Sequence, residues 1–167
     1  MPTVTTTFLE MRSFEELRPK RSADDKFWIG EATTPQWPFN RFLYLTVGGA
    51  WAWNDKREWT DEQWRSYVES DRLRTFVAYH DASPAGYYEL RRDDEAGVEI
   101  AYFGLLPAFI GRGFGGALLT NALEEAWKMA PIRVWVHTCT LDHPAALANY
   151  LARGMRIYKV ELGDTAD

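Results

Sequence analysis

A strand pattern that runs through a proline into a glycine-rich turn constrains this chain more than any other feature. Residues 98–116 read VEIAYFGLLPAFIGRGFGG, and Gly111, Gly113, Gly115 and Gly116 lead directly into a helical pattern. The first backbone N–H groups of a helix have no partner within the helix, and the helix dipole adds partial positive charge at that end. We therefore predict a cradle for a phosphate or another anionic group at this turn.

Length and composition predict one soluble domain covering residues 1–167, with 46% hydrophobic and 26% charged residues. The net charge of −5 argues against a nucleic-acid partner. Cys139 is the single cysteine, which excludes an intramolecular disulfide and fits a reducing compartment. The chain shows neither a signal peptide nor an apolar run of the roughly 18 residues that cross a membrane. We expect a cytoplasmic protein without a membrane partner.

Apolar spacing and capping residues predict one strand and three helices in the first 70 residues. Residues 20–37 give no clear element, although Phe27, Trp28 and Ile29 have the character of buried residues. The predicted elements are a strand at 3–11, a short helix opened by the capping box Ser13–Glu16, a helix over 39–47 that ends at Gly48, and a helix opened by the capping box Thr60–Gln63.

The pattern then changes to the two-residue period of strands, followed by alternating helices and strands. Three adjoining strands form a predicted meander, and the β-α-β-α-β order after it indicates a mixed α/β sheet. The predicted elements are strands at 73–79, 85–91 and 98–105, a helix over 119–130, a strand at 133–139, a helix over 144–153 and a strand at 156–162.

The glycine turn satisfies the pattern GxGxxG, but its context argues against a dinucleotide site. Five residues separate the strand from Gly111, and the next strand ends in His137, Thr138 and Cys139 where a dinucleotide fold needs an acidic residue. No GK[ST] follows, which excludes a nucleoside-triphosphate loop. A purely structural turn and a nucleotide-dependent oxidoreductase remain as alternatives.

The same segment resembles motif A of the GNAT superfamily of acetyl-CoA-dependent N-acetyltransferases, [QR]-x-x-G-x-[GA], here Ile110 to Gly115 with Ile110 in place of Gln or Arg. The resemblance implies a central, mostly antiparallel mixed sheet flanked by helices, and acetyl-CoA as co-substrate without a metal. It also implies that backbone amides of this turn hold the coenzyme pyrophosphate and that the end of the preceding strand pairs with pantetheine. The coenzyme-binding residues implied are Leu105, Leu106, Gly111, Arg112, Gly113, Phe114, Gly115 and Gly116.

A second segment, residues 140–155, resembles motif B of the same superfamily, N-x-x-A-x-x-[LF]-Y-x-x-x-G-F. Ala146, Tyr150 and Gly154 stand at matching spacing, while His143 and Asn149 replace the usual residues. Asn149 is also assigned to the coenzyme site. The resemblance covers roughly residues 70–160 and leaves 1–70 to build the acceptor side. A homodimer is compatible with the superfamily.

The resemblance implies transfer of acetyl to a primary amine of a small molecule or peptide, by direct attack in a ternary complex. A carboxylate is needed to take the proton of the amine, and Glu99 is the candidate base, with Glu89 as the alternative. Strict alternation would place Glu99 on the apolar face of Phe103 and Leu105, where burial raises a carboxyl pKa. An exposed, inactive Glu99 is the competing interpretation. Tyr150 is the candidate acid for the departing thiolate, or else a core aromatic.

Tryptophan and tyrosine side chains are the candidates for the acceptor pocket. Trp51, Trp53 and Tyr87 offer aromatic faces that suit an amine-bearing group, and core packing is the equal alternative. The competing function is an acyl-CoA-binding module or sensor that has lost the chemistry.

Overall fold

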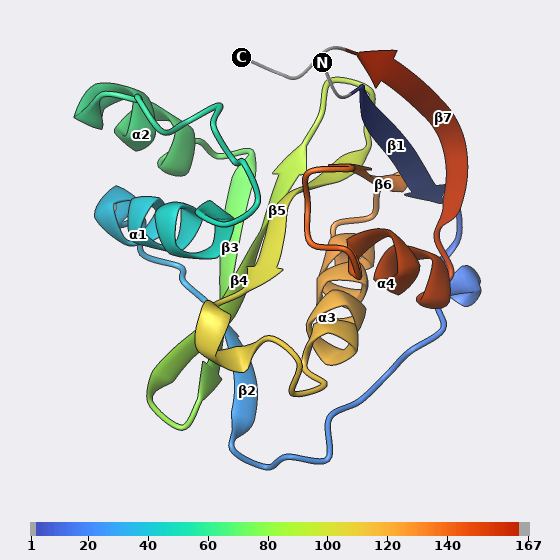
Figure 1. The fold of residues 1–167 in the computed structure, drawn as a ribbon, viewed down its shortest axis with the longest axis horizontal. Coiled ribbons are helices and arrows are strands. Elements are labelled where there is room, and N and C mark those ends of the chain that lie inside the picture. The colour runs from blue at the N-terminus through green and yellow to red at the C-terminus, as the bar shows by residue number, and fades with distance from the viewer. Residues whose placement is uncertain (1–2, 164–167) are drawn as a thin grey trace.

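The computed structural model describes residues 3–163, which form one seven-stranded sheet with helices on both of its faces (Figure 1). The strand order is β2-β3-β4-β5-β6-β1-β7, and every neighbouring pair is antiparallel except β5 and β6. The predicted mixed, mostly antiparallel α/β fold is confirmed. The strands are β1 Val4–Met11, β2 Phe27–Glu31, β3 Leu73–His80, β4 Ser83–Arg92, β5 Val98–Leu105, β6 Val134–Cys139 and β7 Arg156–Gly163. The helices are α1 Trp37–Gly48, α2 Asp61–Val68, α3 Gly115–Lys128 and α4 Ala146–Ala152.

The capping boxes predicted from sequence have different outcomes. At Thr60 the side chain accepts a hydrogen bond from Gln63 N at 3.2 Å, and Gln63 Oε1 accepts one from Thr60 N at 2.9 Å, so α2 begins with a complete box. At Ser13 the hydroxyl accepts only from Glu15 N, and a single 3-10 turn follows at Phe14–Glu16. The helix predicted there is therefore one turn long.

Residues 20–37 contain an edge strand that the sequence pattern did not predict. Within β2, Phe27 and Ile29 are half-buried, but Trp28 is 51% exposed, so its expected burial was wrong. Trp28 lies on the outer surface of the sheet edge, where its ring stacks on Tyr79 at a centroid distance of 4.5 Å. Its indole N–H donates to the backbone oxygen of Asp81 at 2.9 Å.

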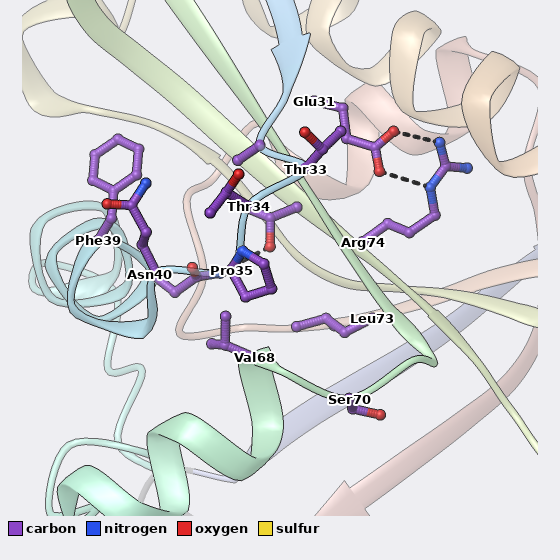
Figure 2. Close-up of a pocket in the computed structure, with 13 residues that line it drawn as sticks. Glu31, Thr33, Thr34, Pro35, Phe39, Asn40, Val68, Ser70, Leu73 and Arg74 are labelled. Atoms are coloured by element: carbon purple, nitrogen blue, oxygen red, sulfur yellow. Dashed lines mark hydrogen bonds and ion pairs between the residues drawn. The ribbon is translucent and has the colours of Figure 1, made fainter.

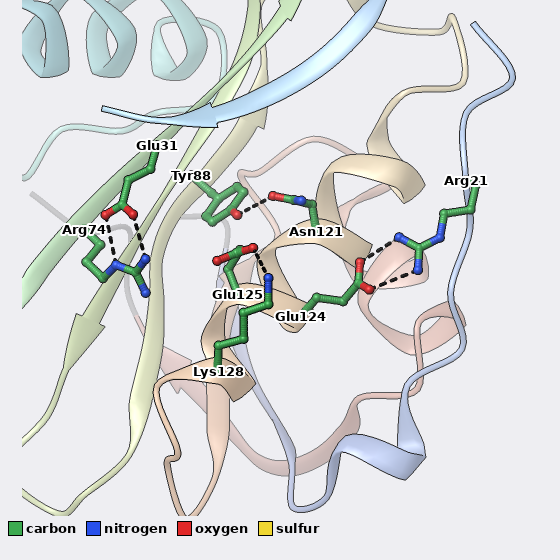
Figure 3. A network of polar contacts seen from close by, with 8 residues as sticks. All are labelled: Arg21, Glu31, Arg74, Tyr88, Asn121, Glu124, Glu125 and Lys128. Carbon is green, nitrogen blue, oxygen red and sulfur yellow. Dashed lines mark hydrogen bonds and ion pairs between the residues drawn. The ribbon is translucent and has the colours of Figure 1, made fainter. Parts of the chain in front are cut away.

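Polar contacts fix the segment that precedes β2 (Figure 3). The two terminal guanidinium nitrogens of Arg21, Nη1 and Nη2, donate to the carboxylate of Glu124 on α3, at 2.6 and 3.0 Å. The backbone N–H of Lys20 donates to Thr120 Oγ1, also on α3, at 2.9 Å. These contacts hold the segment along one side of α3 and bring Lys20 to the start of that helix.

Helices α1 and α3 cover opposite faces of the sheet (Figure 1). On one face, Asn40 of α1 donates to Glu89 Oε2 of β4 at 3.0 Å. On the other face, the hydroxyl of Tyr88, the residue before Glu89 in β4, donates to Asn121 of α3 at 2.5 Å. Because successive strand residues point to opposite faces, these two contacts define an α1 face and an α3 face of the sheet. No helix within residues 3–163 is long and apolar enough to cross a membrane.

Candidate active site

The two parallel strands β5 and β6 separate almost as soon as they begin. They pair only at Val98 with Val134 and at Glu99 with Trp135, so β5 beyond Glu99 has no neighbour on that side. A cavity of about 1020 Å³ occupies the space that opens between the strands. Its walls include residues from β5, β6, the glycine turn, α4 and the loop after α1. The backbone groups along this side of β5 are therefore available to a ligand.

The glycine turn forms one end of this cavity. Gly111 and Gly113 have φ angles of +80° and +86°, which L side chains rarely adopt, and no atom lies within 4 Å of the position of a Cβ at either residue. Helix α3 follows at Gly115 without a side-chain cap and without an acidic residue in its first turn. Its first amides lack helical acceptors, so the geometry is that of an anion cradle.

Two basic side chains cross the start of α3 at Gly116. A Cβ on Gly116 would overlap with the guanidinium of Arg153 and the side chain of Lys20, so these side chains would have to shift to accommodate one. Both basic residues line the cavity, and the buried Nε of Arg153 has no hydrogen-bond partner among residues 3–163. An anion at the cradle would meet the N-terminus of a helix and two cations.

Sequence reasoning missed both of these residues. Lys20 belongs to the stretch without a predicted element. The contacts that hold it on α3, from its own N–H to Thr120 and from Arg21 to Glu124, join residues about a hundred positions apart in the chain. Arg153 follows Tyr150 by three residues in motif B, so its spacing on α4 was an available signal.

The other predicted coenzyme residues divide into two groups. Leu105 and Asn149 line the cavity, and Asn149 Nδ2 donates to the backbone oxygen of Gly115 at 3.0 Å. Leu106 and Phe114 are buried and do not line it. Arg112 does not line it either, because its guanidinium lies over the rings of Phe109 and Phe114 at 5.0 and 5.5 Å. The structure therefore gives Leu106, Arg112 and Phe114 no direct place in the cavity wall.

A bulge in β5 decides the position of Glu99. The β4–β5 register steps from Glu89 opposite Tyr102 to Leu90 opposite Ile100, which leaves Ala101 as an extra residue. Because residues directly opposite each other share a face, Glu99 lies on the α1 face with Tyr102. The expectation that Glu99 shares the face of Phe103 and Leu105 was wrong.

The environment of Glu99 matches that of a candidate base in other respects. Its side chain is 15% exposed and lines the cavity. Burial raises the pKa of its carboxyl, although the positive charges of His137 and Arg91 oppose that rise. Glu99 is therefore neither fully exposed nor fully sequestered.

The alternative base Glu89 lies on the same α1 face but does not line the cavity. It is fully buried, and its carboxylate accepts hydrogen bonds from the Tyr67 hydroxyl at 2.5 Å and from Asn40 Nδ2 at 3.0 Å. Burial raises the pKa of this carboxyl. Tyr67 itself lines the cavity, so Glu89 reaches the cavity only through that hydroxyl.

Tyr150 of α4 lines the cavity on the other side of β5. Its side chain is 5% exposed and its ring packs against Phe103 at a centroid distance of 6.1 Å. Burial, together with the carboxylate of Asp142, raises the pKa of its phenol, so the hydroxyl keeps its proton. Among residues 3–163 no group hydrogen-bonds to this hydroxyl, in agreement with a donor that is reserved for a ligand.

The three predicted acceptor-side aromatics separate in the structure. Trp51 and Trp53 line the cavity, and the Trp53 indole N–H donates to Asp142 Oδ1 at 3.3 Å. Tyr87 is fully buried, its hydroxyl has no hydrogen-bond partner within residues 3–163, and it does not line the cavity. Tyr87 therefore lies in the core, with its ring centroid 6.5 Å from that of Trp53.

A charged cluster that sequence reasoning did not find lines the cavity near Trp53. The carboxylate of Asp55 accepts hydrogen bonds from the hydroxyls of Tyr44 and Tyr102 and from Lys56 Nζ. Burial opposes its ionisation, but the Tyr102 hydrogen bond and the charge of Lys56 hold the pKa of this carboxyl below its ordinary value. Lys56 Nζ in turn lies 4.3 to 5.0 Å from three aromatic ring centroids. The carboxylate and the ammonium group of the cluster therefore neutralise each other.

A second, smaller cavity of about 140 Å³ lies between β2, α1 and the α2–β3 connection (Figure 2). Its wall includes the paired side chains of Glu31 and Arg74, whose carboxylate and guanidinium make contacts of 2.7 and 2.9 Å. None of the predicted site residues lines it. The large cavity is the candidate active site.

Comparison with known proteins agrees with this geometry. A model of the acetyltransferase (GNAT) family matches residues 11–155, which is most of the chain. The chain belongs to the GNAT acetyltransferase family. The match begins at Met11, the last residue of β1, so the family likeness extends well ahead of the region in which sequence motifs are recognisable.

Curated relatives share part of the sequence of this GNAT chain, and solved structures share its fold. Uncharacterized N-acetyltransferases of Mycobacterium tuberculosis and Mycobacterium bovis are 34% identical over 70 residues, which is 42% of this chain and 45% of theirs. The matched region therefore spans less than half the length of these curated relatives. A GCN5-related N-acetyltransferase from Sphaerobacter thermophilus aligns with a TM-score of 0.76 at 15% identity, over 97% of this chain and 51% of that one. An aminoglycoside acetyltransferase from a soil metagenome, in complex with sisomicin, aligns at 0.60 and 14% identity, over 79% and 88%.

A metal site in this GNAT chain would require several ligating side chains close together. Within residues 3–163, no group of three or more His, Cys, Asp or Glu side chains is arranged to hold a metal ion. The carboxylates of Asp55 and Asp142 at the cavity instead accept hydrogen bonds from neighbouring side chains.

Proposed function

We propose that this protein transfers an acetyl group from acetyl-CoA to a primary amine, by direct attack of the amine while both substrates are bound. The observation that carries the proposal is one continuous cavity that joins the glycine cradle at one end to Glu99 and the aromatic wall at the other. Such a cavity accommodates a long anionic donor and a separate acceptor together.

The cradle fits the pyrophosphate of coenzyme A. The positive φ angles at Gly111 and Gly113 leave the backbone open, and the first amides of α3 supply donors. Arg153, with its unpartnered Nε, and Lys20 supply positive charge beside them. When bound, acetyl-CoA brings the acetyl thioester, and the free side of β5 near Leu105 is positioned to pair with its pantetheine arm.

Glu99 is the proposed general base. An ammonium group of pKa near 10 must lose its proton before it attacks, and Glu99 Oε1 or a water bound to it would accept that proton. Burial makes this carboxylate a stronger base than an exposed glutamate. The bulge at Ala101 supports the assignment, because it directs Glu99 toward the face where Tyr102 and Tyr67 form the acceptor wall.

Tyr150 is the proposed general acid. Its phenol stays protonated because of its burial, and its hydroxyl makes no hydrogen bond to protein within residues 3–163. It lies on α4, next to Asn149 at the cradle, while Glu99 lies at the strand junction. Donation of the phenolic proton would neutralise the departing thiolate as the C–S bond breaks. The nitrogen loses its second proton as the amide forms, and this proton, passed through solvent, restores the phenol, while the proton that Glu99 takes up is released to solvent.

The acceptor is a small-molecule or peptide amine. An aminoglycoside belongs in a screen because one structural neighbour is an aminoglycoside acetyltransferase in complex with sisomicin. A polyamine and a peptide with a free N-terminus test the other acceptor sizes. The aromatic wall of Trp51 and Trp53 favours a cationic or apolar group next to the reacting amine.

Free thiol released from acetyl-CoA, measured across this amine panel beside a calorimetric titration with coenzyme A, tests the proposal. Turnover with at least one amine supports it. Tight coenzyme binding without turnover on any amine would instead identify an acyl-CoA-binding module. Failure to bind coenzyme A, together with binding of NAD, would overturn the coenzyme assignment itself.

A further inference from the structure

Strand β7 forms an edge of the sheet and is exposed along its whole length (Figure 1). It pairs with β1 on one side, and no strand within residues 3–163 pairs with its other side. Three of its apolar side chains are substantially exposed, at 47% for Ile157, 54% for Val160 and 75% for Leu162. A long edge strand with open backbone groups is a template for pairing with another strand.

The register with β1 assigns these side chains to faces. Val160 and Leu162 lie opposite Thr7 and Thr5, so they share one face of the sheet. Lys159 and Glu161 project from the other face, where their side chains form an ion pair of 2.6 Å. Along the middle of β7, a charge of each sign therefore flanks Val160.

When two copies of the sequence Lys159, Val160, Glu161 run antiparallel, each lysine lies opposite a glutamate of the other copy. We infer that β7 is the dimer interface of this protein, with two copies pairing antiparallel edge to edge across a two-fold axis at Val160. In this register Lys159 faces the partner's Glu161, Glu161 faces the partner's Lys159, and the two copies of Val160 meet at the axis. The inference does not depend on the proposed acetyl transfer.

Charge disfavours the two neighbouring registers. In a two-fold antiparallel pair, residues directly opposite each other must share a face, so the axis moves in steps of one residue along the strand. An axis at Lys159 sets two lysines opposite each other, and an axis at Glu161 sets two glutamates opposite each other, which is unfavourable. Of these three registers, only the one centred on Val160 pairs opposite charges. The two-fold contact uses the β7 edge of both copies and closes at a dimer.

Variants that reverse one charge of the interface test this inference, with the molar mass in solution as the measurement. The wild-type protein is expected to sediment as a dimer, and Lys159→Glu or Glu161→Lys is expected to halve its mass to the 19.3 kDa of the single chain. An equimolar mixture of the two single variants is expected to recover the dimer as a heterodimer. In that mixture, the two carboxylates on β7 of the Lys159→Glu copy face the two ammonium groups on β7 of the Glu161→Lys copy.

Controls separate the interface from folding and from general charge effects. Lys128→Glu reverses one charge of a comparable exposed ion pair, that with Glu125 at 2.7 Å on α3, and is expected to leave the dimer intact. Circular dichroism melts establish that each variant is folded; surface ion pairs of this kind contribute little to stability. A monomeric wild type across a dilution series, or single variants that remain dimeric, would overturn the inference.

Discussion

Glu99 Oε1 lies 3.9 Å from His137 Nε2, at the point where β5 and β6 separate. The two residues belong to different strands of the only parallel pair in the described sheet, and both line the cavity. The imidazole is half exposed, at 50%, so it is open to both solvent and ligand. This arrangement makes the protonation of the proposed base depend on its neighbour.

Replacement of Glu99 by glutamine removes the proposed base with little change in volume. We expect kcat/KM to fall by about 10² to 10⁴ and the acid limb of its pH profile to disappear, because an amide accepts no proton in this range. The check is initial rates across pH, with coenzyme affinity measured separately. An unchanged profile would leave Glu99 without a catalytic role.

Replacement of His137 by alanine tests the coupling. Burial raises the pKa of Glu99, and positive charge at His137 opposes this rise. Without that charge the pKa rises further, so the acid limb of kcat/KM should move to higher pH, on the order of one unit. His80→Ala is the matched control, because His80 pairs with Asp24 at 2.9 Å and does not line the cavity. A shift of equal size in both variants would refute the coupling.

The pH dependence of stability that Glu89 causes should have the opposite sign to that of an ion-paired carboxylate. Burial raises its folded-state pKa, so the folded protein retains this proton while the unfolded chain loses it. The free energy of unfolding should therefore fall as pH rises from the ordinary glutamate pKa to the raised one. Urea denaturation across this range checks the slope, which Glu89→Gln should reduce. A stability profile identical in both proteins would contradict the linkage.

Much of the fold was predictable because local signals agreed with the tertiary structure. The complete capping box at Thr60 and the alternation of β3 and β4 depend on residues close in sequence. The glycine turn was recognisable for the same reason, since positive φ and a free helix start leave a local signature.

The remaining features depend on contacts that no local pattern reports. The bulge at Ala101 reverses the alternation within β5 and so moves Glu99 to the other face, although nothing in the sequence of the strand marks it. Lys20 lies at the cavity because its own backbone N–H and the neighbouring Arg21 bind to α3, at Thr120 and Glu124. Tyr87 fits a pocket wall by residue type, but it lies beneath Trp53 in the core.

Two substitutions of Gly115 distinguish the effect of charge from that of side-chain size at the cradle. The nearest atom that a Cβ there would meet is Asn149 Nδ2 at 3.6 Å, so Gly115→Ala should fold and retain coenzyme affinity within a few-fold. Gly115→Asp adds a negative charge where the pyrophosphate is proposed to bind, and a repulsion of a few kcal/mol should weaken binding on the order of 100-fold. Calorimetric titration with coenzyme A measures both.

The melting temperatures of the two Gly115 variants show whether a loss of coenzyme affinity comes from unfolding. An acidic residue in the first turn is favourable for a free helix, so Gly115→Asp should not melt at a lower temperature than Gly115→Ala. Equal coenzyme affinity of the two variants would refute the cradle.

Tyr150→Phe removes only a hydroxyl that makes no hydrogen bond within residues 3–163. If this hydroxyl protonates the departing thiolate, kcat should fall by about 10² to 10⁴ while KM for acetyl-CoA and the melting temperature change little. Tyr88→Phe should show the reverse, because the Tyr88 hydroxyl donates to Asn121 at 2.5 Å on the α3 face and does not line the cavity. Loss of that bond should lower the free energy of unfolding by about 1 kcal/mol and leave kcat unchanged. Steady-state rates and denaturation curves on the two variants measure both quantities. If Tyr150→Phe, like Tyr88→Phe, lowers only the free energy of unfolding and leaves kcat unchanged, Tyr150 has a packing role.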